Sequence, residues 1–184
     1  MARLSNLRDI ERLYATRGGL NYGEGVTQLE HALQCAALAQ ERRASPSLVV
    51  AALLHDIGHL FADEEDAARA DDRHEIAGAW ALGALFGEAV RRPIALHVAA
   101  KRYLCLRDAD YFQALSQASR DSLRLQGGPF DVAEAAAFEA MPYWQDAIFL
   151  RKLDDMGKRE ELSGLGFKDF AAVMRSVMTS GAGT

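Results

Sequence analysis

The feature that most constrains the fold is a run of six apolar residues that leads straight into a histidine and an aspartate. The run extends from Val49 to Leu54 and has no polar position, so a helix made from it must be buried almost all round. Ser45 and Pro46 supply an N-cap and a first-turn proline, and we expect the helix to end near Asp56. Two polar side chains at the end of a buried helix need partners that offset their desolvation, and a bound metal would supply them.

The length and composition favour one helical unit. A chain of 184 residues suits a single core, and 49% hydrophobic residues with only four prolines favour packed helices over disorder. We therefore predict an all-α protein with a single domain over residues 1–184. Within it, the N-terminal helix in 1–19 and the tail 175–184 are predicted to be peripheral.

The spacing of apolar residues predicts where the helices lie. Gly18 and Gly87 read as helix ends, and Pro93 fits a helix only if it lies in the first turn. Residues 63–72 form an acidic loop that we expect to lie in solvent, residues 126–129 form a turn, and no strand is expected. The predicted helices cover about 5–17, 26–43, 45–56, 74–85, 90–98, 111–115, 119–125, 131–140 and 142–157, and the last two close the helical set.

Charge and cysteine content argue against several classes of partner. A formal net charge of -5 offers no basic stripe for nucleic acid, although a small anionic substrate remains possible. No apolar run reaches the roughly 18–20 residues that are needed to span a membrane, so we expect no membrane-spanning helix. Cys35 and Cys105 are too isolated to form a disulfide framework and are interpreted as small core residues. We expect a cytoplasmic protein that is a monomer or a weak homodimer.

The histidines and two aspartates together indicate a metal site. One histidine on a helix is usually a hydrogen-bonded core or surface residue, but here several lie on separate predicted helix faces beside apolar positions. Nitrogen and oxygen ligands without thiolate suit Fe, Mn, Co or Zn, and the residues alone do not choose among these metals. The predicted ligands are His31, His55, Asp56, His74, His97 and Asp154.

The order of these residues resembles the HD superfamily of metal-dependent phosphohydrolases and oxygenases. The resemblance implies a single HD-domain helical bundle with a buried dinuclear metal site, in which Asp56 bridges the two metals. One metal would then take the two histidines His31 and His55 together with Asp154, and the other would take His74 and His97. Six protein ligands leave open positions on two metals, so the site reads as catalytic.

Longer segments are similar to the phosphonate-cleaving HD-domain oxygenases, over about residues 20 to 160. That family uses a mixed-valent Fe(II)/Fe(III) pair and O2 to cleave the carbon-phosphorus bond of a 1-hydroxyphosphonate, which gives phosphate and a carboxylate. The implied substrate is 2-amino-1-hydroxyethylphosphonate or its 2-trimethylammonio analogue, and the product is glycine or glycine betaine. The matching segments are 23–24, 28–31, 54–59, 97–104, 118–120 and 126–129.

The resemblance also implies substrate-binding residues, and their spacing agrees with it. Lys101 follows His97 by four residues, so it lies on the same helical face, and His59 follows His55 in the same way. Arg151 precedes the predicted ligand of the last helix by three residues and would offer a planar donor fork to phosphonate oxygens. The predicted catalytic residues are Asp56, His59 and Lys101; the predicted substrate-binding residues are Tyr22, Glu24, His59, Lys101, Ser119, Ser122, Gln126 and Arg151.

One loop departs from the family pattern. The family has Tyr, any residue, Gly, Glu, where the tyrosine caps an open iron position and the glutamate meets the substrate amine. Here Asn21 occupies the tyrosine position and Tyr22 comes one place late, while Glu24 still matches. Either Tyr22 reaches the iron after a small adjustment or the cap is missing, and a carboxylate at Glu24 suits both a primary amine and a quaternary ammonium group.

Two other functions compete with an oxygenase. An HD phosphohydrolase acting on a nucleotide or small phosphate ester uses nearly the same ligands, with metal-bound hydroxide attacking phosphorus. A degenerate HD module could instead sense a ligand or contact a protein. All six predicted ligand positions are filled in this chain, which argues against degeneration.

Overall fold

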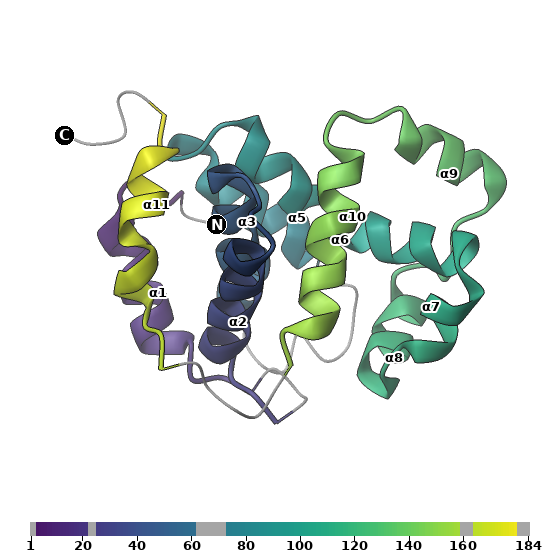
Figure 1. Cartoon of the computed structure of the whole chain (residues 1–184), viewed down its shortest axis with the longest axis horizontal. Coiled ribbons are helices and arrows are strands. Elements are labelled where there is room, and N and C mark those ends of the chain that lie inside the picture. The colour runs from purple at the N-terminus through teal and green to yellow at the C-terminus, as the bar shows by residue number, and fades with distance from the viewer. Residues whose placement is uncertain (1–2, 22–24, 62–72, 159–163, 180–184) are drawn as a thin grey trace.

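The computed structural model is all-helical and describes residues 3–21, 25–61, 73–158 and 164–179 (Figure 1). Tyr22, Glu24 and the predicted acidic loop 63–72 lie outside the described residues. In the described ranges there is no strand, and no helix is long and apolar enough to cross a membrane. The α-helices are α1 (Leu7–Arg17), α2 (Gln28–Glu41), α3 (Pro46–Leu54), α5 (His74–Ala81), α6 (Glu88–Arg107), α7 (Ala109–Ala114), α8 (Gln117–Leu125), α9 (Val132–Glu139), α10 (Trp144–Met156) and α11 (Ala171–Ser176). Three 3-10 turns, η1 (Ile57–Phe61), η2 (Leu82–Ala84) and η3 (Phe167–Phe170), complete them.

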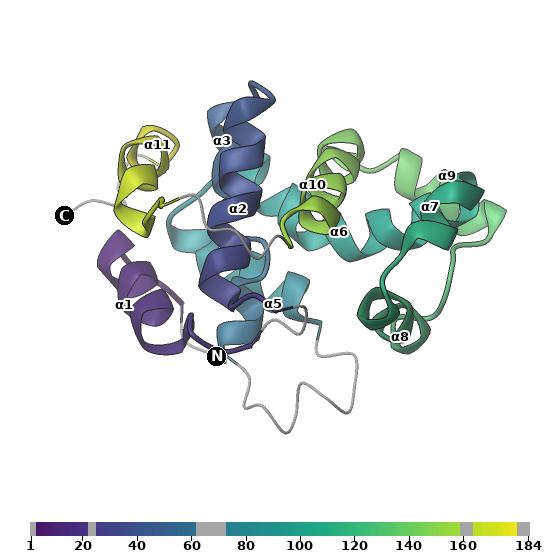
Figure 2. The same cartoon turned by 60° about the horizontal axis from the view of Figure 1, so that its bottom comes forward.

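Helix α3 lies at the centre of the molecule, as its apolar sequence predicts. Every residue from Leu48 to Leu54 is buried, and the helix packs against α2, α6, α10 and α11 (Figures 1 and 2). The Ser45 hydroxyl accepts the backbone N–H of Leu48, and Pro46 is the first residue of the helix, so both start signals are confirmed.

Helices α6 and α10 pack closely on one another and separate two regions of the molecule. Figure 1 shows α1 and α11 on one side, and α7, α8 and α9 on the other. A second, smaller apolar cluster lies on the α9 side of the pair and consists of Leu96, Ala100, Phe138 and Ala147. Helix α6, which carries Lys101, therefore packs along the helix that carries Asp154, and Lys101 also contacts Ser122 on α8.

Three features differ from the sequence-based expectations. Pro93 lies in the second turn of α6 and not the first, because the helix begins five residues earlier, at Glu88. Proline has no N–H group, so the helix lacks one backbone hydrogen bond at this position. The predicted helix over 74–85 ends at Ala81 and continues as the 3-10 turn η2. Residues 142–157 do not close the helical set, since η3 and α11 follow and bury Phe170 and Met174 against the core.

The backbones of η1 and α5 approach each other at two glycines. A β-carbon on Gly58 would collide with the backbone carbonyl of His74, and one on Gly78 would lie 3.1 Å from Ile57 Cγ2. Because η1 follows Asp56 directly, this contact fixes the distance between the His-Asp pair and the first residue of α5. Glycine is required at position 58 for space and not for an unusual backbone angle.

Gly58→Ala is therefore expected to lower the free energy of unfolding by about 1–3 kcal/mol, because the methyl group forces η1 and α5 apart. Gly19→Ala is the matched control: the added methyl group meets no atom within 4 Å, and we expect a change within about 0.5 kcal/mol. Urea unfolding of the two variants measures the difference. Equal stability of both variants would show that the close contact is not required.

Candidate metal centre

The six predicted metal ligands converge from five parts of the chain. His31 lies on α2, His55 and Asp56 follow α3, His74 begins α5, His97 lies on α6 and Asp154 lies on α10. None of the six is more than 6% exposed. The fold thus brings together residues that are more than a hundred positions apart, in a cluster of the kind that an HD dinuclear metal site needs.

The carboxylate of Asp56 lies between two pairs of imidazoles. Its Oδ2 atom is 3.7 Å from His31 Nε2 and 3.4 Å from His55 Nε2. Its Oδ1 atom is 3.4 Å from His74 Nε2 and 3.5 Å from His97 Nε2. Each oxygen therefore faces one half of the cluster, which is the arrangement that a carboxylate bridging two metals requires.

Backbone carbonyls fix the orientation of three of these rings. The Nδ1 atom of His31 lies 2.8 Å from Gly157 O, that of His55 lies 2.9 Å from Ala52 O, and that of His97 lies 2.8 Å from Ile94 O. A carbonyl oxygen can only accept a hydrogen bond, so Nδ1 must carry the proton in each ring. In the neutral rings Nε2 then presents a lone pair to the centre of the cluster, as metal-ligating histidines do.

The Nε2 atoms of the histidines face one another at the centre of the cluster. His31 Nε2 and His55 Nε2 are 3.2 Å apart, and so are His74 Nε2 and His97 Nε2. His31 and His55 both hold their proton on Nδ1, so as neutral rings they cannot hydrogen-bond to each other through Nε2. A cation in each half would satisfy these atoms, so the donor set fits two metal ions.

The charges of the cluster agree with this interpretation. Burial alone would raise the pKa of Asp56, but His55 and His74 hold the pKa of this carboxyl well below its usual range. Burial together with the neighbouring His74 lowers the pKa of His97 well below its usual range. An ionised carboxylate beside a neutral imidazole binds metal without first losing protons. Against the effect of burial, Asp56 and Asp154 raise the pKa of His55, so this ring would give up a proton when a metal binds.

Asp154 presents one oxygen to the cluster and the other to a buried arginine. Its Oδ1 atom is 3.3 Å from His31 Nε2 and 3.9 Å from His55 Nε2. Its Oδ2 atom lies 2.7 Å from Arg151 Nη1. Asp154 therefore belongs to the His31 and His55 half of the cluster.

His59 and Cys35 lie at the edge of the cluster. The His59 ring stacks on His74 with 3.8 Å between ring centroids, and it is half-buried on η1. Cys35 lies 3.7 Å from His31 Nε2, and burial raises the pKa of its thiol well above the usual value, so the thiol is neutral. Cys35 and Cys105 are both buried, as predicted.

Residues predicted to bind substrate gather where α6 meets α8. The Lys101 ammonium donates to Ser122 Oγ at 2.7 Å, and this hydroxyl donates to Ser119 O at 3.1 Å. Ser119 Oγ in turn accepts from Lys158 Nζ at 3.4 Å. Gln126 follows α8 and has a buried Oε1 atom for which the described residues show no hydrogen-bond donor. Their roles toward substrate stay predictions.

Arg151, predicted as a donor to phosphonate, is held by other side chains. Its guanidinium contacts Asp154 and also Asp155 and Tyr111, two residues that the sequence interpretation did not single out. Its role toward phosphonate stays a prediction.

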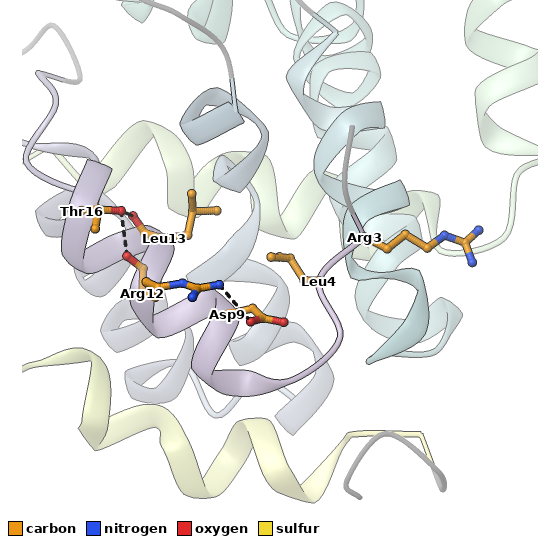
Figure 3. A pocket seen from close by; sticks show the side chains of 6 residues that line it. All are labelled: Arg3, Leu4, Asp9, Arg12, Leu13 and Thr16. Atoms are coloured by element: carbon orange, nitrogen blue, oxygen red, sulfur yellow. Dashed lines mark hydrogen bonds and ion pairs between the residues drawn. The ribbon is translucent and has the colours of Figure 1, made fainter.

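A surface pocket of about 320 Å³ lies beside α1, away from these residues. Thr16 and Leu13 line it from the helix, and Arg3 extends away at its edge (Figure 3). None of the predicted site residues lines it: the lining side chains are Arg3, Leu4, Asp9, Arg12, Leu13 and Thr16. This pocket is therefore separate from the buried cluster.

Comparisons with known proteins identify the family. Residues 29–115 match the HD domain. A hydroxymethylphosphonate dioxygenase of Gimesia maris is 47% identical over 161 residues, which cover 85% of this chain and 80% of the relative. The chain belongs to the HD-domain phosphonate dioxygenases. A [1-hydroxy-2-(trimethylamino)ethyl]phosphonate dioxygenase (glycine-betaine-forming) of Leisingera caerulea is 41% identical to this dioxygenase over 171 residues, 90% of this chain and 87% of the relative. Uncharacterized protein L432 of Acanthamoeba polyphaga mimivirus is 36% identical over 161 residues, 84% and 74% of the two chains.

The family confirms the predicted enzyme class and HD fold. This dioxygenase is an O2-dependent oxidoreductase that cleaves a carbon-phosphorus bond and takes a small phosphonate as substrate. The HD-domain match contains His31 to His97 but ends before Asp154, so the α10 side of the centre lies beyond the matched segment.

Sequence interpretation missed the side chains and backbone groups that support the predicted ligands. Lys158 follows Asp154 by four residues, a spacing that could have revealed it. The Gly157 carbonyl has no side-chain signature, and Tyr111 lies on a distant short helix.

The dioxygenase is expected to hold about two metal ions per chain, and Asp56→Asn is expected to lose both, because an amide has only one oxygen acceptor and no charge to share between them. Elemental analysis of protein loaded and purified without oxygen gives the stoichiometry. Glu88→Gln, which removes an exposed carboxylate on α6, serves as the control and should keep both ions. A folded parent protein without stoichiometric metal, or an Asp56→Asn variant that keeps both ions, would refute the bridging role.

Proposed function

We propose that the dioxygenase cleaves a 1-hydroxyphosphonate with a cationic group at C2, at an Fe(II)/Fe(III) pair held by the six predicted ligands. The observation that carries this proposal is the Asp56 carboxylate between two imidazole pairs, within a fold shared with phosphonate dioxygenases. When bound, the iron pair supplies the redox chemistry with O2. The chain itself binds the substrate, orients it and excludes water.

The phosphonate end is proposed to meet the ammonium group of Lys101. This side chain is 2% exposed, and burial together with the charge of Arg151 lowers its pKa to about 8. A buried cation for which the described residues show no salt bridge is stabilised by an incoming anion, and Ser122 Oγ, which accepts from it at 2.7 Å, is proposed to yield this ammonium group to the phosphonate. The second cation nearby, Lys158, adds to the attraction.

His59 is proposed to contact the reacting end of the substrate. Its ring lies against His74, in the metal half that contains His97, and one face of η1 leaves it partly exposed. A ring nitrogen there is in position to hydrogen-bond a substrate oxygen and to hold or release a proton.

The cationic end is proposed to meet Glu24, with an aromatic contact from Tyr22 if the group is quaternary. This assignment depends on the sequence pattern, because both residues lie outside the described ranges. The Leisingera relative, whose name specifies a trimethylamino substrate and glycine betaine, supports it. The Gimesia relative favours a second candidate substrate, hydroxymethylphosphonate, which has no cationic group.

The phosphohydrolase alternative has no support from the comparisons, because both named relatives are dioxygenases. The degenerate module is likewise disfavoured, since the buried cluster is complete. A monomer or weak homodimer in the cytoplasm stays a prediction.

A panel of three substrates tests the proposal: hydroxymethylphosphonate, 2-amino-1-hydroxyethylphosphonate and its 2-trimethylammonio analogue. With Glu24→Gln we expect kcat/KM for the two cationic substrates to fall about 10- to 100-fold, because a charge-assisted contact is lost. Hydroxymethylphosphonate is the internal control and should be unaffected. Phosphate release with matching O2 uptake is the readout.

Two results would contradict the proposal. Phosphate release under strict anaerobiosis would exclude the oxygenase reaction. A parent enzyme that cleaves only hydroxymethylphosphonate would replace the cationic substrate with the second candidate.

Activity is also expected to depend on the charge of Lys101. Protonated Lys101 attracts the phosphonate, so kcat/KM should decrease as pH rises through about 8, the pKa of this ammonium group in the folded protein. Lys101→Met should lower kcat/KM about 100-fold at neutral pH and lose this decrease, whereas Lys101→Arg stays charged and keeps its activity above pH 8. If kcat/KM of both variants still decreases through the same pH range, the decrease is caused by a group other than Lys101.

A further inference from the structure

Arg151 is held by a set of hydrogen bonds that link it to two acidic neighbours and a tyrosine. On α10 it precedes Asp154 by three residues and Asp155 by four, so one side chain reaches both carboxylates. Its Nη1 atom lies 2.7 Å from Asp154 Oδ2, while Nη2 contacts Asp155 Oδ1 and Nε lies 3.2 Å from Asp155 Oδ2. The guanidinium therefore contacts Asp155 through Nε and Nη2, and its Nη1 atom contacts Asp154.

Tyr111 completes the arrangement from another part of the chain. Its hydroxyl donates to Asp155 Oδ2 at 2.7 Å and accepts from Arg151 Nε at 3.1 Å. The ring packs against the apolar cluster of Cys105, Leu115 and Leu123, which fixes its direction. Burial raises the pKa of the Tyr111 phenol well above its usual value, so the phenol stays protonated and remains a donor.

We propose that Asp155 and Tyr111 are positioning residues for the metal centre. Together they hold the guanidinium of Arg151 against Asp154 Oδ2, which leaves Oδ1 as the atom that faces the metal. The inference depends on Asp154 being a metal ligand, as the proposed function assigns it. Asp154 would then bind a metal through Oδ1 alone, because its Oδ2 atom already contacts the guanidinium of Arg151.

Outer hydrogen bonds of this kind fix the orientation of a ligand and hence its affinity for metal. Without the Tyr111 hydroxyl, Asp155 loses one donor and Arg151 loses one acceptor, so the guanidinium is free to turn away from Asp154. Asp154 then has more freedom to rotate, and the metal shared with His31 and His55 is held less firmly. The network adjoins the half of the cluster that contains His31 and His55, because it acts through Asp154.

The chain contains a matched control for the same chemistry. Tyr103 donates to Glu139 Oε1 at 2.8 Å, and Arg107 Nη2 lies 2.9 Å from the same oxygen. This second set of tyrosine, carboxylate and arginine joins α6 to α9 and includes none of the predicted metal ligands. Tyr103→Phe therefore removes an equivalent hydrogen bond from a site that should not affect the metals.

The test measures metal release and needs no substrate. Parent, Tyr111→Phe, Asp155→Asn and Tyr103→Phe proteins are loaded with Fe(II) without oxygen, and release is followed with a coloured Fe(II) chelator. In Tyr111→Phe, one of the two equivalents is expected to leave about 10- to 100-fold faster. Asp155→Asn should accelerate the same equivalent further, and Tyr103→Phe should release both as the parent does.

Thermal unfolding of the metal-free proteins separates this role from a purely structural one. Tyr111→Phe loses two hydrogen bonds and Tyr103→Phe loses one, so the first variant is expected to be somewhat less stable. Faster metal release from a Tyr111→Phe protein that is still fully folded at the assay temperature supports the proposal. Release kinetics of Tyr111→Phe equal to those of the parent would overturn it, whether or not Asp155→Asn folds. Failure of the proposed function would instead appear as absent carbon-phosphorus cleavage in a parent enzyme with normal metal release.

Discussion

The whole site depends on the ionised carboxylate of Asp56, which has an imidazole pair on each side. A carboxylate and imidazoles that are removed from water carry a desolvation cost, which a bound cation offsets. Helix α3 makes this position unavoidable, because its apolar surface on every side forces its end into the core. The backbone carbonyls that hold three Nδ1 atoms then turn the lone pairs inward, so that folding and metal binding favour one another.

The metal half that includes His31 is built differently from the other half. It draws on α10 for Asp154 and for the Gly157 carbonyl, and a β-carbon at Gly157 would collide with Cys35 Sγ. The half that includes His74 depends on the close approach of η1 and α5 at Gly58. Each half of the cluster thus includes a close contact at a glycine that a β-carbon would block, with the His74 backbone at Gly58 and with the Cys35 side chain at Gly157.

Local pattern predicted much of the fold and the candidate ligands. The start of α3, its central place and the shared helical face of His97 and Lys101 follow from short-range spacing, which one sequence displays directly. Contacts between residues far apart in the sequence cannot be predicted from such spacing. Tyr111 meets Asp155 over forty-four positions with no spacing rule to indicate it, and α11 was missed because six residues with one fully buried methionine give little periodicity.

The residues proposed to bind substrate and those proposed to support the metal lie on neighbouring helices. The contact of Lys101 with Ser122 ties α8 to α6, and the contact of Tyr111 with Asp155 ties α7 to α10. Helices α7 and α8 are consecutive in the chain, so the proposed phosphonate-binding donors and the proposed support of Asp154 lie on one segment of fewer than twenty residues. An anion that draws Lys101 away from Ser122 would break the contact between α6 and α8 and leave the contact of Tyr111 with Asp155 in place. On the proposed roles, a shift of this segment would therefore act on substrate binding and on Asp154 together.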